Sequence, residues 1–112
     1  MIVAHVIEWS PFTFNTPQEN EERHMRREAE LERAHKEIID PVVDALRERR
    51  IMARGVIRHG HAAETLGLIA EEFGVHNIII GKVGTSRIRA QLFGSVAISM
   101  VQVSPRPITV VP

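Results

Sequence analysis

Three glycines and a serine in the second half of the chain have the residue types and the spacing that could hold a phosphate group. Gly81 ends the apolar run 78–80, Gly84 follows it, and Gly94-Ser95 opens another apolar run. Glycine lets the backbone approach a ligand, and a helix beginning near Ser95 offers free N–H groups and a positive dipole end. The serine hydroxyl suits either a helix cap or a phosphate contact. The pattern predicts a phosphate-binding loop or, in a purely structural interpretation, two tight turns.

The loop differs from the common phosphate-binding motifs, and no catalytic constellation accompanies it. Lys82 does not occupy the lysine position of G-x-x-x-x-G-K-[ST], and the spacing is not G-x-G-x-x-G. No carboxylate pair, Ser-His-Asp order or metal-binding trio stands out in the sequence. His59-Gly60-His61 supplies two histidines without a third ligand nearby, which favours a loop role. We therefore predict neither catalytic nor metal-binding residues.

The composition excludes several classes of protein. The chain has 112 residues, of which 44% are hydrophobic, and this suits one domain with a modest core. Its 14 basic and 14 acidic side chains lack the excess positive charge of a general nucleic-acid binder. Without cysteine it has neither disulfides nor a cysteine-based zinc site. Because no secretory signal or transmembrane run is visible, we expect a cytoplasmic protein that binds neither membranes nor nucleic acid.

The chain alternates between strand and helix patterns, and these elements must position the glycine loop. We predict strands at 2–9, 51–58, 75–80 and 108–111, and helices at about 17–50, 62–73 and 95–103. Such alternation implies an α/β fold with a parallel sheet, in which ligands bind at the carboxyl ends of strands. The glycine loop follows the strand 75–80 and lies at that edge.

The same patterns predict which residues are buried. Pro41 should kink or restart the long helix, with Asp40 capping its second piece. The unbroken apolar run 78–80 predicts a strand covered on both faces, and the helix 95–103, apolar nearly all round, should be buried. Gly74 should cap the helix 62–73. The predicted core-facing positions are Ile38, Val42, Ala45 and Leu46 in the first helix, and Leu66, Ile69, Ala70 and Phe73 in the second.

The sequence resembles the universal stress protein family over nearly its whole length. The resemblance implies a single domain over 1–112 with a doubly wound, mostly parallel sheet of the adenine nucleotide alpha hydrolase-like type, with about four strands in this chain. The segments that carry it are the motif Gly81-x2-Gly84-x9-Gly94-Ser95, typical of the nucleotide-binding members; AHVIE at 4–8, similar to the family's second strand; 58–81, similar to its third helix and fourth strand; and 95–111, similar to its closing helix and strand.

The resemblance also implies an ATP site at the glycine loop, with magnesium as a possible companion ion. The family's motif assigns the roles residue by residue. Val6 would present its backbone to the adenine edge, and Ile80 would border the ribose or base. The phosphates and ribose would be lined by Gly81, Gly84, Gly94 and Ser95, and Val96 would donate its N–H to the same region. The linker over the phosphates would contain Thr85, Ser86 and Arg87.

The sequence departs from the family at its start. Members normally begin with a further strand and helix that carry a nucleotide-contacting aspartate, whereas this chain is N-terminally short and begins at the family's second strand. The missing strand belongs in the middle of the sheet. Either the strand 2–9 pairs directly with the strand 75–80 in a four-stranded sheet, or a partner chain fills the gap with a swapped element.

We therefore expect a universal stress protein-type regulator that binds ATP in stress-response signalling and acts as a homodimer. The dimer would form through the strand 108–111, a natural edge strand, or through a swapped element. The alternative is a dimeric interaction module of the same fold that binds no nucleotide and needs no cofactor. We do not expect an enzyme, because no base or water-positioning residue can be named, although a weak ATPase activity is not excluded.

Overall fold

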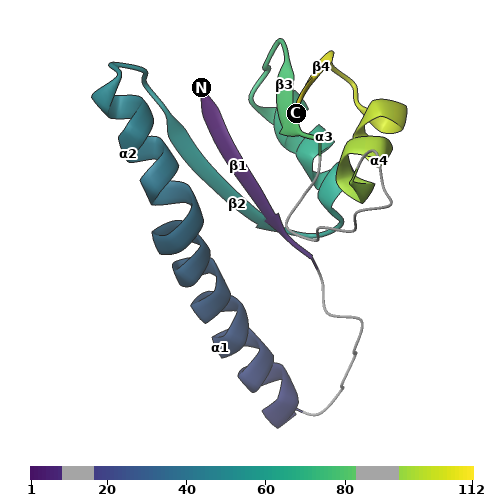
Figure 1. Cartoon of the computed structure of the whole chain (residues 1–112). Helices are drawn as coiled ribbons and strands as arrows, with labels where there is room; N and C mark the ends of the chain where they lie inside the picture. The colour runs from purple at the N-terminus through teal and green to yellow at the C-terminus, as the bar shows by residue number, and fades with distance from the viewer. Residues whose placement is uncertain (9–16, 83–93) are drawn as a thin grey trace. The chain divides into compact units, whose positions relative to one another are not determined.

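The computed structural model describes residues 1–8, 17–82 and 94–112. Along the chain the elements are β1 (Ile2–Ile7), α1 (Pro17–Ala34), the π-helical turn η1 (His35–Ile39), α2 (Asp40–Glu48), β2 (Arg54–His59), α3 (Ala62–Glu72), β3 (Ile78–Gly81), α4 (Ser95–Val103) and β4 (Ile108–Val111) (Figure 1). They divide between two compact units, Met1–His59 and Gly60–Pro112, and each unit is described by itself. The single domain over 1–112 stays a prediction. Across the described ranges, no helix is long and apolar enough to span a membrane.

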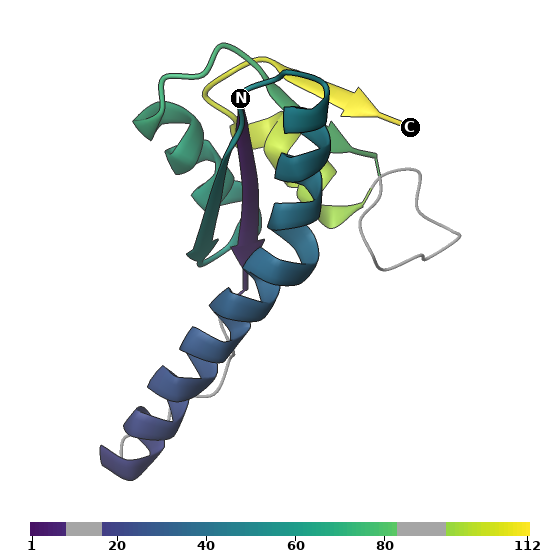
Figure 2. The same cartoon turned by 90° about the vertical axis from the view of Figure 1, so that its left-hand side faces the viewer.

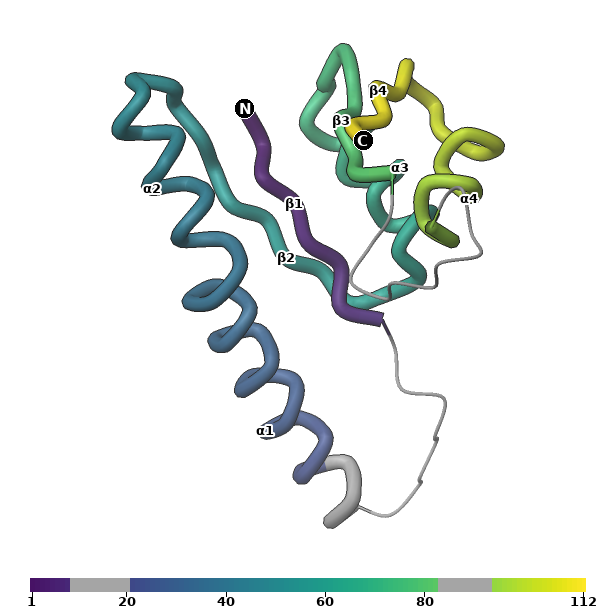
Figure 3. The backbone as a smooth tube through the Cα atoms, viewed as in Figure 1, coloured from purple at the N-terminus to yellow at the C-terminus, as the bar shows by residue number. Residues whose placement is uncertain are grey.

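The first unit is a two-stranded parallel sheet with a long helix along it. β1 and β2 pair in parallel from Ile2 opposite Arg54 to Ile7 opposite His59, and Figure 3 shows their tubes side by side. The N–H of Arg54 donates to the Met1 carbonyl at 3.0 Å, which fixes the start of both strands. In Figures 1 and 2, α1, η1 and α2 form one continuous rod whose α1 end extends beyond the sheet.

The long helix passes Pro41 without a break. Asp40 has helical dihedrals, φ −58° and ψ −42°, and its N–H bonds to the His35 carbonyl five residues back, as in a π-helix. The predicted cap at Asp40 is therefore wrong, because a capping residue has non-helical dihedrals. The wider π turn directly before the proline gives its ring room, where a regular α-helical turn would bring it against a carbonyl.

The π turn also changes which face of the helix meets the sheet. The buried residues are Ala34, Ile39 and Val43. Ala34 and Ile39 are five positions apart, whereas Ile39 and Val43 are four positions apart. The predicted stripe is wrong at Ile38 and Val42, one position earlier, which are each 45% exposed. Ala45 is also exposed, whereas Leu46 is half-buried as predicted. One extra residue in a turn shifts every later side chain around the helix axis, and sequence spacing alone gives no sign of it.

Close contact between the helix and β2 depends on a glycine in the strand. The Ile39 side chain, only 1% exposed, lies over Gly55, and a Cβ atom at Gly55 would overlap the Cγ2 atom of Ile39. Val43 packs beside it. The absence of a side chain at Gly55 is thus what lets the helix come down onto the sheet.

The second unit combines the parallel pair β3–β4 with α3 and α4. Pairing runs from Ile78 opposite Ile108 to Gly81 opposite Val111. The core lies between the helices, and its buried residues are Ile69 and Ala70 of α3 and Ala97 and Met100 of α4. The predicted core face of α3 is confirmed, since Leu66 and Phe73 are half-buried beside these residues.

Two predictions about burial in the second unit are wrong. Side chains of β3 alternate, and Ile79 is 63% exposed, so this strand is covered on one face only. α4 buries Ala97 and Met100, whereas Val101 is 65% exposed. A continuous apolar sequence predicts cover on all sides, but in this unit a two-stranded sheet and two short helices provide cover on one side.

The four strands form two separate sheets of two strands each. Within the described residues, β1 pairs only with β2 and β3 only with β4. The alternative in which the strand 2–9 pairs directly with the strand 75–80 would join the two units, and it stays a prediction. The other alternative, a swapped element from a partner chain, stays a prediction.

The contact at Gly55 yields a stability prediction. We expect Gly55→Ala to lower the free energy of unfolding by about 1–3 kcal/mol, because the new methyl group must displace the buried Ile39 side chain. Gly67→Ala is the matched control: it lies inside α3, and its Cβ would be 3.4 Å from Cδ of Pro105, an ordinary contact. Urea unfolding followed by circular dichroism measures both. A Gly55→Ala protein as stable as wild type would contradict the close packing.

The end of α3 yields a second prediction. Gly74 has φ +60°, its N–H bonds to the Glu71 carbonyl at 3.2 Å, and Val75 N–H bonds to the Ala70 carbonyl at 3.1 Å. This confirms that Gly74 terminates the helix, as the first residue after its C-cap. Gly74→Ala should lower the free energy of unfolding by about 1 kcal/mol, since a Cβ atom disfavours positive φ. Thermal unfolding tests this, and an unchanged Tm would show that the turn does not hold its conformation in solution.

Candidate functional site

Two backbone hydrogen bonds bring the ends of the glycine loop together. The N–H of Lys82 donates to the Val111 carbonyl at 2.7 Å, which extends the β3–β4 ladder by one residue. The N–H of Gly94 donates to the Lys82 carbonyl, also at 2.7 Å. The first residue before α4 is thereby held against the residue that follows β3. We call this place, built from Gly81, Lys82, Gly94, Ser95 and Val96, the β3–α4 corner.

The corner presents the amino end of α4. Gly94 is the N-cap residue, with extended dihedrals of φ −68° and ψ 161°, and its carbonyl accepts the first helical bond from Ile98 N–H at 3.1 Å. Because glycine has no side chain, the N-cap contributes no hydrogen bond to the first turn. The N–H groups of Ser95 and Val96 belong to that turn, where the helix dipole favours negative charge. Ser95 is exposed and is the first helical residue, so it does not act as the N-cap.

Positive φ does not explain the two motif glycines that the structure describes. Gly94 has φ −68°, and Gly81 is not among the described glycines with positive φ, which are Gly60 and Gly74. Most residue types could adopt these conformations, so neither turn requires glycine for its backbone. At both positions glycine places no side chain at the corner. The structural interpretation, in which the backbone turns require glycine, therefore finds no support at these two positions.

The role of Gly94 differs in one respect from the expected one. Its N–H already bonds to the Lys82 carbonyl, so this group is not available to a phosphate. Gly94 would therefore serve a ligand by lacking a side chain, while Ser95 and Val96 supply the donors. In the sequence, Lys82 is notable only because it does not occupy the lysine position of a nucleotide-binding motif. In the structure, Lys82 anchors the β3–α4 corner through both its N–H and its carbonyl. Only the pairing of β3 with β4 could have shown this role.

The remaining predicted site residues lie in three places. Ile80 is half-buried in β3, immediately before Gly81, so the fold places it at the corner. Val6 is half-buried in β1, opposite Arg58 of β2, and belongs to the first unit. Its contact with an adenine ring stays a prediction. The other four residues, Gly84, Thr85, Ser86 and Arg87, fall in the loop 83–93, outside the described residues.

The histidines show no metal centre in the described part of the chain. Nε2 of His59 lies 3.4 Å from Oε2 of Glu30, so this side chain links the end of β2 to α1. His24 lies 3.1 Å from Glu28 on the exposed surface of α1. Among the residues described, no three histidine, cysteine or carboxylate side chains are grouped so that they could hold a metal ion.

Comparison with known proteins identifies the family. The model of the universal stress protein family matches residues 1–112. The structure of hypothetical protein MJ0577, solved as a test of assigning biochemical function from structure, has a TM-score of 0.79 and 26% sequence identity, covering 98% of this chain and 73% of that one. The universal stress protein UspA from Lactobacillus plantarum has a TM-score of 0.71 and 20% identity, covering 99% and 76% respectively. No curated protein matches the sequence.

These matches confirm two of the predictions. The α/β architecture with parallel strands is that of the doubly wound universal stress proteins, although a quarter or so of each solved chain has no counterpart here. The motif glycines, the parallel strand pairs and the closing helix and strand all lie within the matched segment. Since the family model extends over the full sequence, this chain belongs to the universal stress protein family.

Proposed function

We propose that this chain binds ATP at the β3–α4 corner and acts as a nucleotide-dependent regulator in a stress response. The observation that carries the proposal is the hydrogen bond from Gly94 N–H to the Lys82 carbonyl. It holds the amino end of α4, without a capping side chain, beside Gly81 at the carboxyl end of β3. Membership of the universal stress protein family and the complete G-x2-G-x9-G-S motif support the same function.

The corner suggests how the nucleotide would be held. The phosphates would accept hydrogen bonds from the N–H groups of Ser95 and Val96 and from the Ser95 hydroxyl, next to the positive end of α4. Ile80 and Gly81 would border the ribose. Thr85, Ser86 and Arg87 would close over the phosphates from the linker. A magnesium ion would accompany the phosphates as part of the ligand, since we assign no protein ligand to it.

This arrangement supports binding rather than catalysis. Every group assigned to the phosphates is a backbone N–H, a hydroxyl or a linker cation, and none is a general base near the terminal phosphate. ATP occupancy would therefore act as the signal, with turnover at most slow. The alternative function is an interaction module of the same fold that works without nucleotide.

Calorimetric titration of ATP and ADP with magnesium tests the site. We expect micromolar binding by the wild type and its loss in Gly94→Val, because two methyl groups would fill the space at the amino end of α4. Gly94 has dihedrals that valine also adopts, so this variant should fold. Gln102→Val is the matched control, as it places the same side chain at an exposed position near the other end of α4.

Two outcomes would contradict the proposal. Unchanged affinity in a folded Gly94→Val protein would show that nucleotide binds elsewhere. Absence of binding to folded wild type would support the interaction module, with the glycine motif as an inherited turn.

We also propose a homodimer that pairs through β4. In this strand the carbonyls of Pro107 and Val111 bond to β3, so the alternating backbone groups of Ile108 and Val110 point to the opposite edge. Sedimentation at micromolar concentration should give a dimer for wild type. Val110→Pro, which removes one outward N–H and no bond to β3, should shift it toward monomer with its circular dichroism retained. A monomeric wild type, or a folded variant that stays dimeric, would contradict this seam.

A further inference from the structure

A basic hollow opens in the first unit at the amino ends of its two strands. Its volume is about 430 Å³, within the range of pockets that enclose a small molecule or a large side chain. It is lined by Met1 and Ile2 and by residues of the segment 47–54, which runs from the last turn of α2 to the start of β2. Its lining residues are arginine or apolar, and none of them is acidic.

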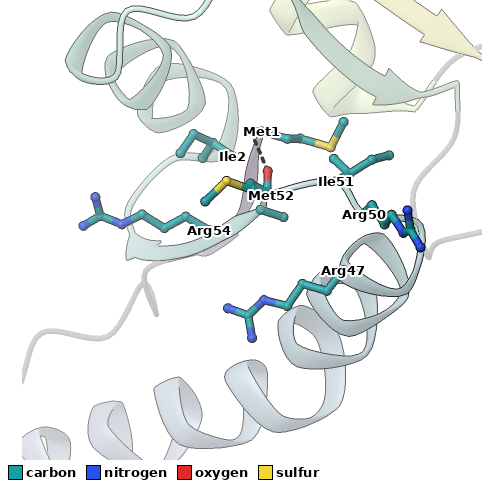
Figure 4. Close-up of a pocket in the computed structure, with 8 residues that line it drawn as sticks. Met1, Ile2, Arg47, Arg50, Ile51, Met52 and Arg54 are labelled. Carbon is teal, nitrogen blue, oxygen red and sulfur yellow. Dashed lines mark hydrogen bonds between the residues drawn. The ribbon is translucent and has the colours of Figure 1, made fainter.

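The arginines of this hollow point outward in different directions. Figure 4 shows the side chains of Arg47, Arg50 and Arg54 leading away from one another, with the apolar side chain of Met52 in the space between them. A single compact anion cannot meet all three guanidinium groups. Positive charges spread in this way suit a partner surface that carries several separated negative charges.

Two of these cations lack a counter-charge. In the part of the chain that the structure describes, the guanidinium groups of Arg47 and Arg50 make neither an ion pair nor a hydrogen bond. Asp44, one turn before Arg47 on α2, does not pair with it. Cations at a helix C-terminus stabilise the helix dipole, and this accounts for basic residues here in general. It does not explain why position 50 holds a residue with a side chain.

Arg50 occupies a position at which glycine would be more stable. Its φ is +62°, its N–H bonds to the Arg47 carbonyl at 2.9 Å, and Ile51 N–H bonds to the Leu46 carbonyl at 2.9 Å. α3 ends with the same pair of bonds, and there Gly74 has the left-handed conformation. A side chain at this position carries a conformational cost. A strained residue at the basic hollow indicates that its guanidinium has a use there.

The apolar part of the hollow is exposed to solvent. Met52 is 88% exposed, Met1 62% and Ile51 37%. Methionine and arginine are both enriched at protein–protein interfaces, where apolar side chains form the centre and charged ones the rim. Flexible methionine side chains also adapt to partners of varied shape. The hollow therefore has the composition of a small docking surface.

We propose that the basic hollow docks an acidic amphipathic helix of a partner protein. An apolar side chain of that helix would enter the hollow against Met52 and Ile51. Carboxylates on either side of the helix's apolar stripe would meet Arg47 and Arg50. Charge complementarity favours an acidic partner, and the concave apolar centre favours a protruding side chain over a flat lipid surface. The site lies within the first unit and does not depend on the nucleotide proposal.

The test is fluorescence anisotropy of a labelled peptide titrated with the full chain. The probe is a synthetic helical peptide with a leucine stripe and glutamate at its other positions. We expect it to bind with a Kd of about 50 μM, and more weakly as the salt concentration rises. Replacing its leucines by alanine should weaken binding about tenfold, and replacing its glutamates by lysine should abolish it.

Variants of the full chain locate the binding surface. Arg47→Gln and Arg50→Gln in one protein should weaken the acidic peptide about tenfold, and Met52→Ser about fivefold. The matched control combines Arg26→Gln and Arg33→Gln, which remove the same charge from exposed positions of α1 that do not line the hollow. Circular dichroism checks that each variant folds. Equal losses in the two double variants would overturn the proposal, because they would show attraction to the overall charge alone.

Arg50→Gly separates a binding role from a structural one. It should raise the Tm, because glycine favours the left-handed conformation, and at the same time weaken the acidic peptide about threefold. An arginine kept only to stabilise the helix end would instead give a lower Tm and unchanged peptide binding. That result would overturn the proposal.

Further measurements distinguish the other possible occupants. Co-sedimentation with phosphatidylserine vesicles that is lost in the Arg47 and Arg50 double variant would assign the hollow to an anionic membrane and overturn the proposal. Self-association that is lost in the same variant would assign it to a second copy of the chain, with the same consequence. A wild type that does not bind the acidic peptide would also overturn it. Gly94→Val should leave peptide binding unchanged, so this result and the nucleotide titration are independent.

Discussion

The hydrogen bond from Gly94 N–H to the Lys82 carbonyl is the interaction on which the candidate nucleotide site depends. It spans the loop 83–93 and fixes where α4 begins relative to the end of β3. Lys82 is in turn held by Val111, so the corner is anchored on the last strand of the chain. A helix N-terminus binds anions only where its free N–H groups point at open space, and neither motif glycine places a side chain there. The positions of Ser95 and Val96 follow from this bond.

The fold keeps the family's parallel pairing as two strand pairs. β1–β2 carries the long helix on one face, and the contact of Ile39 with Gly55 holds helix and strand together. β3–β4 has α3 and α4, whose buried side chains form the core of the second unit. Two-stranded sheets bury little surface, and this explains why Ile79 and Val101 are exposed although their sequence neighbourhoods are continuously apolar. A partner chain at these edges and faces would bury apolar surface that each unit leaves exposed.

The proposed nucleotide site relies mainly on the backbone. At the β3–α4 corner, backbone donors and a helix dipole would hold phosphates, and side chains contribute little beyond the Ser95 hydroxyl. Recognition of this kind tolerates variation in the rest of the loop.

The sequence by itself determined the family, the element types and most of their positions, because glycine spacing, apolar periodicity and capping residues are local signals. The helix at 95–103 and the strand at 108–111 have the predicted bounds. The tertiary structure alone decided which side chains are buried. A π turn before Pro41 moved the core position from Ile38 to Ile39, and the separation into two strand pairs exposed Ile79. It also decided that Lys82 anchors the corner and that Arg47, Arg50 and Arg54 line one hollow. Both outcomes depend on pairing between strands far apart in the chain, and local sequence patterns do not encode which strand edges meet.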